Sequence, residues 1–432
     1  MTEQKKDIFD SPAYRRSRGA YYIQCAAEYL VTLVVADAFL AKLLNALGLS
    51  DAAIGIVSSL TSLAFLVQLG TIFLMQHIRN VKKTVIFLDI SSMLCFMATY
   101  LLPFLEAPQV LRTALVFATI GGGFGLKYLQ LNLYYKWGQS FVRPGGRGTF
   151  SAKNEAISQA AGVAFTLVIG AVVDYYDRVG RLETSFLVIA CVIACLTVVN
   201  FVMLLSIQSY SRREAVSQQK PIRDVLKNTL GNPNFRHVIV MISLYDIGRY
   251  LTVGFLGTYK TQDLLLTVGT VEIINVCASV LRCVLSRPAG KWADRTSFAH
   301  VYQMGLWLCA FSFLLLMFTT PDRWWLVIGY TLCYHGSMAA IPGNANNMTY
   351  SYVPIDYFVQ AQAIRSSIAG VLGFLASILG SRILSFIQAN GNCLFGIPVY
   401  GQQVLAALSL FVILGAIAYN QCVISKQKII LQ

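Results

Sequence analysis

The feature that most constrains this chain is a series of twelve long apolar stretches joined by shorter polar connections. Each stretch has about the 20 residues that an α-helix needs to cross a hydrocarbon core of roughly 30 Å. We therefore predict twelve transmembrane helices. They cover residues 21–41, 52–76, 85–105, 110–135, 155–173, 185–207, 236–259, 264–286, 300–319, 324–348, 366–388 and 402–424.

The distribution of basic residues predicts how these helices are oriented. Of the 34 Lys and Arg residues, 25 lie in the two tails, in every second connection or at the helix ends beside these connections. Short loops rich in Lys and Arg stay on the cytoplasmic side of a membrane. We therefore expect a multi-pass protein of the plasma membrane, the cell inner membrane, with both termini in the cytoplasm. The formal charge of +14 follows mostly from this bias, so we expect no nucleic-acid partner.

Composition supports a protein that lies within a lipid bilayer. The chain is 56% hydrophobic and only 12% charged, about half the charged fraction of a soluble domain. A polar tail, residues 1–20, precedes the first apolar stretch, so we expect no cleaved signal peptide. The ten cysteines lie mostly in or beside apolar stretches, without the spacing of metal ligands. We therefore predict no disulfide framework, no metal site and no cofactor.

The longest polar connection divides the chain into two halves of six predicted helices each. Shifting the sequence by 208 residues places Lys127 on His335 and Asp37 one residue from Asp246, which indicates an internal duplication. The expected parts are a cytoplasmic N-terminal tail (1–20), an N-terminal six-helix bundle (21–207), a cytoplasmic linker (208–235), a C-terminal six-helix bundle (236–424) and a cytoplasmic C-terminal tail (425–432).

A short motif follows the eighth apolar stretch, and it reads Gly290-Lys291-Trp292-Ala293-Asp294-Arg295-Thr296. It resembles the G-x-x-x-D-R signature between helices 8 and 9, and 2 and 3, of the major facilitator superfamily of transporters. The resemblance in topology and repeat covers nearly the whole chain. It implies that Gly290 permits a tight turn, and that Asp294 and Arg295 bond to the eleventh helix and close an inner gate. The first-half copy, residues 76–83, lacks both the Gly and the Asp.

The same resemblance implies an all-α polytopic membrane protein of the major facilitator fold. Its twelve transmembrane helices would form two pseudo-symmetric six-helix bundles, with the first, fourth, seventh and tenth helices around a central cavity. The resemblance therefore implies that Lys127, Asp37, Asp246 and His335 all lie at this central cavity. Ionisable groups inside a bilayer are costly and need a partner or a purpose. We expect Lys127 to be a substrate-binding cation, with a snorkelling or structural lysine as the alternative.

Further polar residues lie at a similar depth to these charges. Asp246 and Arg249 share a helix face by their i, i+3 spacing, so they either bind substrate or only hold helices together. Amides and aromatic rings suit a small polar solute with hydroxyl groups. The predicted substrate-binding set is Lys127, Gln130, Asp37, Tyr245, Asp246, Arg249, His335 and Asn344.

Coupling to an ion gradient requires a group that changes its charge or coordination between states. Glu28, Asp37 and Asp246 are the candidates to carry a proton. The stretch 52–76 contains no acid after Asp51, so the paired acids of a sodium-coupled carrier of the melibiose type are absent there. Proton coupling is therefore favoured. No G-x-x-x-x-G-K-[ST] loop is present, which argues against direct ATP drive.

These observations predict a secondary active transporter that moves a sugar or an organic anion by alternating access. We expect a monomer in the lipid bilayer, with a small-molecule substrate, protons as the coupling ion and no enzymatic activity. One alternative is an efflux antiporter for drugs or metabolites, although its Gly-x-x-x-Gly-Pro pattern is missing from the fifth helix. Others are an acyltransferase-like membrane enzyme with His335 as general base, and a non-transporting sensor or assembly factor.

Overall fold

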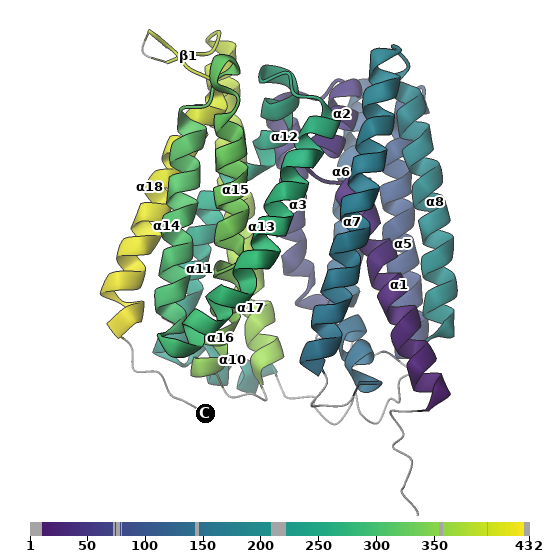
Figure 1. Cartoon of the computed structure of the whole chain (residues 1–432), viewed down its shortest axis with the longest axis vertical. Coiled ribbons are helices and arrows are strands. Elements are labelled where there is room, and N and C mark those ends of the chain that lie inside the picture. Colours follow the sequence, from purple (N-terminus) through teal and green to yellow (C-terminus); the bar gives the residue numbers. More distant parts are fainter. Residues whose placement is uncertain are drawn as a thin grey trace, which may run out of the picture. The chain divides into compact units, whose positions relative to one another are not determined.

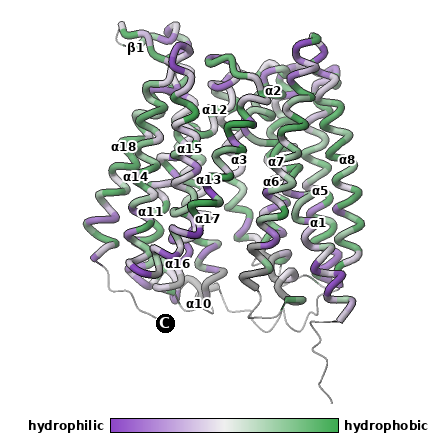
Figure 2. The backbone as a smooth tube through the Cα atoms, viewed as in Figure 1, coloured by the Kyte–Doolittle hydropathy of each residue, from purple (hydrophilic) through white to green (hydrophobic). Residues whose placement is uncertain are grey.

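A computed structural model of the chain describes residues 11–71, 74, 78, 80–142, 147–208, 222–353, 357–394 and 396–426. These residues are almost entirely helical (Figure 1). They form two compact units, and each is described separately here. Unit 1 comprises Met1–Leu47 and Val67–Gln219, and unit 2 comprises Gly48–Leu66 and Lys220–Gln432. Figure 2 shows that the long helices are mostly apolar.

Unit 1 is built from long helices whose starts are marked by capping side chains. Ser11 accepts a hydrogen bond from the backbone N–H of Tyr14 at 3.4 Å, and Asn80 accepts one from Lys83 at 3.1 Å. Such caps satisfy N–H groups that the helix itself leaves unpaired. The elements are α1 (Pro12–Val34), α2 (Asp37–Ala46), α5 (Val81–Leu101), the 3₁₀ turn η2 (Leu102–Phe104), α6 (Gln109–Ser140), α7 (Arg147–Arg178) and α8 (Leu182–Ser206).

One end of unit 1 brings together segments that are distant in sequence. The Lys82 ammonium, at the start of α5, donates to the carbonyls of Leu205 and Ile207, both at 2.7 Å, at the C-terminal end of α8. The backbone N–H of Gln208 donates to Ser17 Oγ on α1 at 3.1 Å. A cation at a helix C-terminus also interacts favourably with the helix dipole. The N-terminal segment thus meets the connections after the predicted second and sixth helices at one end of this unit.

Unit 2 combines long helices with several short or broken ones. Two short strands near residue 395 pair in antiparallel fashion, with Cys393 opposite Pro398. The elements are α3 (Asp51–Val67), α10 (Ile222–Leu230), α11 (Pro233–Tyr250), η4 (Val253–Phe255), α12 (Leu256–Thr258), the π-helical turn η5 (Tyr259–Asp263), α13 (Val268–Arg295), α14 (Phe298–Met317), η6 (Pro321–Arg323), α15 (Leu326–Met338), α16 (Ile341–Tyr352), α17 (Phe358–Ala389), β1 (Cys393–Leu394), β2 (Ile397–Pro398), α18 (Gly401–Cys422) and η8 (Ile424–Lys426).

Helix α3 belongs by its contacts to unit 2, although it comes from the N-terminal half of the sequence. The hydroxyls of Ser59 and Ser377 are 2.5 Å apart, and Ser381 donates to a backbone carbonyl of α3 at 3.1 Å. Gly370 on α17 lies so close to α3 that a Cβ there would sit 2.3 Å from the carbonyl oxygen of Ser62. Small residues allow this close approach of two helix backbones.

Nine helices within the described residues are long and apolar enough to cross a membrane. The three other predicted stretches, 21–41, 52–76 and 324–348, are interrupted or only partly described. The first breaks between α1 and α2, where Asp37 has a φ of 40°. The second holds α3, after which residues 72–73, 75–77 and 79 lie outside the described part. The third breaks between α15 and α16, where Pro342 lies in the first turn of α16 and cannot continue the helical hydrogen bonding of α15.

The tight turn expected at Gly290 is not formed. Helix α13 continues through Pro288 and Gly290 and ends at Arg295, nine residues beyond the predicted apolar stretch. Apolarity marks the part of a helix that contacts lipid or protein core, whereas backbone hydrogen bonding continues into the polar sequence. A Cβ at Gly290 would meet no atom within 4 Å, so this position does not require glycine for packing.

Candidate functional site

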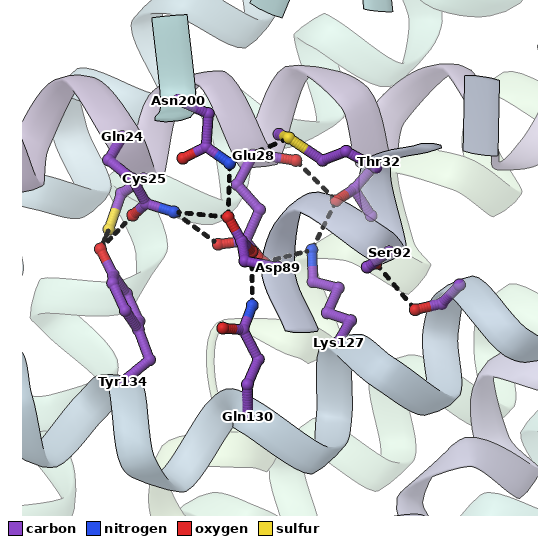
Figure 3. Close-up of polar contacts among 12 residues, drawn as sticks. Gln24, Cys25, Glu28, Thr32, Asp89, Ser92, Lys127, Gln130, Tyr134 and Asn200 are labelled. Carbon is purple, nitrogen blue, oxygen red and sulfur yellow. Dashed lines mark hydrogen bonds and ion pairs between the residues drawn. The ribbon is translucent and has the colours of Figure 1, made fainter. Parts of the chain in front are cut away.

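A partly buried ion pair joins α1 and α6 in unit 1. Lys127 Nζ lies 3.0 Å from Glu28 Oε1, and it donates to Thr32 Oγ1 at 2.6 Å (Figure 3). The two charged side chains are only 17% and 16% exposed. The structure thus brings together Lys127, which the sequence predicted as a substrate-binding cation, and Glu28, which it predicted as a proton carrier.

The glycine-rich segment before Lys127 determines how closely α6 approaches α5. A Cβ at Gly123 would lie 2.5 Å from the ring of Phe96. The Ser92 hydroxyl donates to the Gly123 carbonyl at 2.8 Å. Close packing at this point fixes the next turn of α6, which carries Lys127.

Behind the ion pair, Asp89 is the centre of a polar network within the bundle. Its side chain is 1% exposed, and its carboxylate accepts hydrogen bonds from the amides of Gln130 and Asn200. The Gln24 amide nitrogen lies 3.5 Å from Asp89 Oδ2 and 3.3 Å from Glu28 Oε2, so it connects the two acids. Figure 3 shows these amides around the Asp89 carboxylate. Buried polar groups require such partners.

In unit 2, the predicted pair of Asp246 and Arg249 lies on one face of α11. Arg249 Nη1 is 3.7 Å from Asp246 Oδ1, which is a long contact, and both side chains are partly exposed. The guanidinium also donates to the Tyr250 hydroxyl at 2.9 Å and lies 4.5 Å from the centre of that ring. Tyr245 is buried, and its hydroxyl contacts the sulfur of Met338 at 3.4 Å. The cluster therefore combines both charges with aromatic surface.

Arg365 is a buried cation that lies one residue before the predicted apolar stretch 366–388. It lies within α17 and is 6% exposed. Its guanidinium donates to the Ala345 carbonyl at 2.9 Å, to Thr349 Oγ1 at 2.7 Å and to Asn346 Oδ1 at 2.8 Å, all on α16. The planar guanidinium presents several donors in a fixed geometry. Arg365 therefore fixes α16 to α17.

The remaining predicted binding residues lie in varied settings. Asp37 is half-buried in the first turn of α2, where its negative charge interacts favourably with the helix dipole. His335 is in the last turn of α15, with an edge contact to the Tyr334 ring at 6.0 Å. Asn344 is buried and donates to the Ala340 carbonyl of its own segment at 2.7 Å. One donor of Asn344 is thus already used locally.

The predicted gate residues lie at the end of α13. Gly290 is inside this helix, and Arg295 is its exposed last residue. The side chain of Asp294 lies outside the described residues. Within the described part of the chain, no acceptor for the Arg295 guanidinium is found. The gate contact to the eleventh predicted helix therefore stays a prediction.

Solved structures of transporters share this fold. A mutant of the nucleoside transporter NupG aligns with a TM-score of 0.72 and 13% identity, over 95% of this chain and 99% of that one. PepTSo, a POT family transporter, aligns with a TM-score of 0.71 and 10% identity, over 95% and 99%. A D-xylose–proton symporter aligns with a TM-score of 0.67 and 13% identity, over 93% and 97%.

No protein-family model matches the chain, and no curated protein matches its sequence. The similarity at these identities is one of fold. The chain has the all-α, multi-pass membrane fold of the major facilitator type. The similar structures named above are transporters and not enzymes.

Proposed function

We propose that this chain is a secondary active transporter of a small polar solute, either a sugar or an organic anion. It works by alternating access across the plasma membrane, as carriers with related halves do. The fold supports this proposal, because the similar structures include a nucleoside transporter and a sugar–proton symporter.

The observation that carries the proposal is the Glu28–Lys127 ion pair. A charged group at the centre of a transmembrane helix costs about 2.5 kcal/mol or more, and here two of them lie beside a hydroxyl, Thr32. Both side chains keep part of their surface exposed, so a polar solute has access to them. An oxygen atom of the solute accepts a hydrogen bond from Lys127 in place of Glu28. The released Glu28 carboxylate then takes up a proton, which couples the two movements.

The α11 cluster of unit 2 is a second group of proposed substrate-binding residues. Asp246 and Arg249 are both partly exposed, and their long contact leaves donor and acceptor capacity for a ligand. Asp37, Tyr245 and His335 belong to the same proposed set. Gln130 and Asn344 contribute less, because the structure gives their amides bonds within the protein.

The proposed topology has twelve spans in a monomer with cytoplasmic termini. The nine long helices are joined by three interrupted or partly described ones, the α1–α2 segment, α3 and the α15–α16 segment. The bias of Lys and Arg toward alternate connections supports this orientation. Gly290, Asp294 and Arg295 form the proposed inner gate at the end of α13.

A thermal-unfolding screen of the purified protein with sugars, nucleosides, organic acids, amino acids and cationic drugs tests the proposal, because a bound solute stabilises by mass action. We expect one class of small polar solute to raise the melting temperature of the wild type and of Lys42→Met. Lys127→Met should lose that response, and Asp246→Asn should weaken it. Stabilisation by cationic drugs alone would instead support the efflux antiporter. An equal response in all variants would refute the site.

Proton coupling predicts a separate result in vesicles loaded with buffer and given an acidic exterior. Uptake of the stabilising solute should rise with the imposed proton gradient and fall when an ionophore collapses it. In Glu28→Gln the gradient should have no effect, because the carboxyl group that takes up the proton is gone. Unchanged gradient dependence in that variant would assign the coupling to another residue.

A further inference from the structure

Within the described residues, Asp246 and Arg249 form no hydrogen bond or ion pair outside their own helix, α11. Arg249 Nη1 lies 3.7 Å from Asp246 Oδ1, and Nη2 donates to the hydroxyl of the adjacent Tyr250 at 2.9 Å. A charge that fixes the packing of helices bonds to a second helix, as Arg365 does to α16. Ionisable groups inside a bilayer are costly and need a partner or a purpose. The contacts of this pair do not join two helices, so they do not account for its cost.

Most of the hydrogen-bonding capacity of the pair is unused. A guanidinium has five N–H donors. In the described part of the chain, Arg249 Nε has no partner, and the 3.7 Å from Nη1 to Asp246 is too long for a hydrogen bond. No described group donates a hydrogen bond to the Asp246 carboxylate, whose interactions are with Arg249 and Arg365 alone. The side chains of Arg249 and Asp246 are 28% and 19% exposed, so a small solute has access to both.

The charges around this pair leave one positive charge in excess. Asp246 interacts electrostatically with both Arg249 and Arg365. It is the one acid among the main electrostatic partners of these two guanidiniums in the described residues. Their other partners are tyrosines, which are uncharged at neutral pH. These are Tyr245, Tyr250 and Tyr334 for Arg249, and Tyr302 for Arg365. A solute with a single negative charge balances this cluster, whereas a neutral sugar does not.

We propose that the transported solute is a hydroxycarboxylate, an organic anion with a hydroxyl group beside its carboxylate. The carboxylate accepts paired hydrogen bonds from Arg249, the arrangement that a planar guanidinium favours. The hydroxyl donates to Asp246, which has no other described donor. Tyr250, whose ring centre lies 4.5 Å from the guanidinium carbon, holds the plane of Arg249. An amino acid fits less well, because its ammonium group cancels the negative charge that the cluster requires.

This inference rests on the proposed function, since it names the class of solute that the α11 cluster binds. The two can nevertheless fail separately. A neutral sugar that binds and enters vesicles would uphold the carrier and overturn the hydroxycarboxylate. A hydroxycarboxylate that binds through Arg249 and does not enter vesicles would uphold the site and contradict the carrier.

The first experiment follows thermal unfolding of the full-length wild type in detergent, at neutral pH and constant ionic strength. Lactate is compared with propionate, which lacks the hydroxyl, with propylene glycol, which lacks the charge, and with alanine, which carries an ammonium group instead. Gluconate and glucose form a larger pair. Bound solute raises the melting temperature by mass action. We expect lactate or gluconate to act at concentrations at least about tenfold lower than their counterparts, as for one charge-assisted hydrogen bond.

The remaining outcomes of this experiment contradict the proposal. Stabilisation by glucose or propylene glycol at the same concentrations as by the acids would show that the site does not require an anion. Stabilisation by propionate equal to that by lactate would remove the hydroxyl from the proposal. A response to alanine alone, or to none of the six solutes, would overturn it.

Two variants of Arg249 locate the carboxylate. Arg249→Gln should raise the concentration of the stabilising acid needed for half of the effect about 10- to 100-fold. Arg249→Lys keeps the charge but loses the paired donors, so it should recover part of this loss. Arg382→Gln is the control, because Arg382 is exposed, and it should keep the wild-type value. Equal values in Arg249→Gln and Arg382→Gln would overturn the site.

One variant of Asp246 locates the hydroxyl. Asp246→Ala removes the acceptor, so lactate should lose its advantage over propionate while both still bind through Arg249. An undiminished preference for lactate in this variant would overturn the role of Asp246. If Arg249→Gln does not fold, the comparison of Arg249→Lys with the wild type and the lactate preference of Asp246→Ala still decide the question.

Discussion

At the scale of single residues, the bundle of unit 1 satisfies two carboxylates in different ways. Glu28 has a cationic partner, whereas Asp89 is held by neutral amides from three helices. Glu28 keeps some exposure and Asp89 has almost none. A group that exchanges partners during transport needs access to the solute, so Glu28 suits coupling better than Asp89 does.

Removing Lys127 should destabilise the protein more than removing a surface lysine. Lys127→Met leaves the Glu28 carboxylate without its cation, which costs about 2–3 kcal/mol in a largely buried pair. Lys42→Met breaks the more exposed pair with Asp177, and such pairs contribute about 0–1 kcal/mol. Chemical denaturation of the two variants measures the difference. The double variant Glu28→Gln, Lys127→Met should recover part of the loss, and equal losses in the two lysine variants would argue against a buried pair.

Arg365 should not be replaceable by lysine. Arg365→Lys keeps the charge but loses the planar guanidinium that bonds three acceptors on α16. We therefore expect a lower melting temperature and a loss of about 1–3 kcal/mol in the free energy of unfolding. Arg382→Lys is the control on the same helix, because Arg382 is exposed. Differential scanning fluorimetry compares the two. If Arg365→Lys has the same melting temperature as the wild type, the contacts of the guanidinium between α16 and α17 do not contribute to stability.

The sequence identified Lys127 and Glu28 because a charge within an apolar stretch is visible without any structure. It placed Arg365 in a connection, because the predicted apolar stretch begins one residue later. In the structure, the helix already begins at Phe358 and contains Arg365. The network around Asp89 was not predictable. Gln24, Gln130 and Asn200 lie on three helices distant in sequence, and no local pattern indicates that their amides converge.

At the scale of elements, the α3–α17 contact depends on residues without bulky side chains. Gly370→Ala would place a methyl group against the α3 backbone, so we expect a loss of about 1–3 kcal/mol from overpacking. Gly415→Ala, in α18, meets no atom within 4 Å, and alanine in a helix should stabilise by about 0.5–1 kcal/mol. Thermal unfolding of the two variants should therefore shift in opposite directions. A stabilised Gly370→Ala protein would show that the two helices are not closely packed there.

Hydropathy predicted where the helices lie, but not where each one breaks or ends. The stretches 21–41 and 324–348 are continuous in apolarity, yet they are interrupted near Asp37 and Pro342. Helix α13 continues to Arg295, beyond its apolar part. Apolarity reports the environment of a side chain, whereas helix ends depend on backbone geometry and capping.

At the scale of the whole molecule, the distribution of basic residues predicts which loops face the cytoplasm. In a cysteine-free background, Ser425→Cys should react with a membrane-impermeant thiol reagent only in inside-out vesicles. Asn390→Cys, in the connection before α18, should react only in intact cells. Both positions are exposed in the structure. The reverse pattern would invert the proposed topology.

The central claim is that the Glu28–Lys127 pair is part of the binding site of a carrier. The most direct test is uptake of a radiolabelled solute, chosen by the thermal screen, into vesicles that contain purified wild type, Lys127→Met or Lys42→Met. We expect saturable uptake by the wild type and by Lys42→Met, and at least a tenfold lower rate for Lys127→Met, as for loss of one charge-assisted hydrogen bond. Uptake by Lys127→Met at the wild-type rate, or no uptake of any stabilising solute by the wild type, would contradict it.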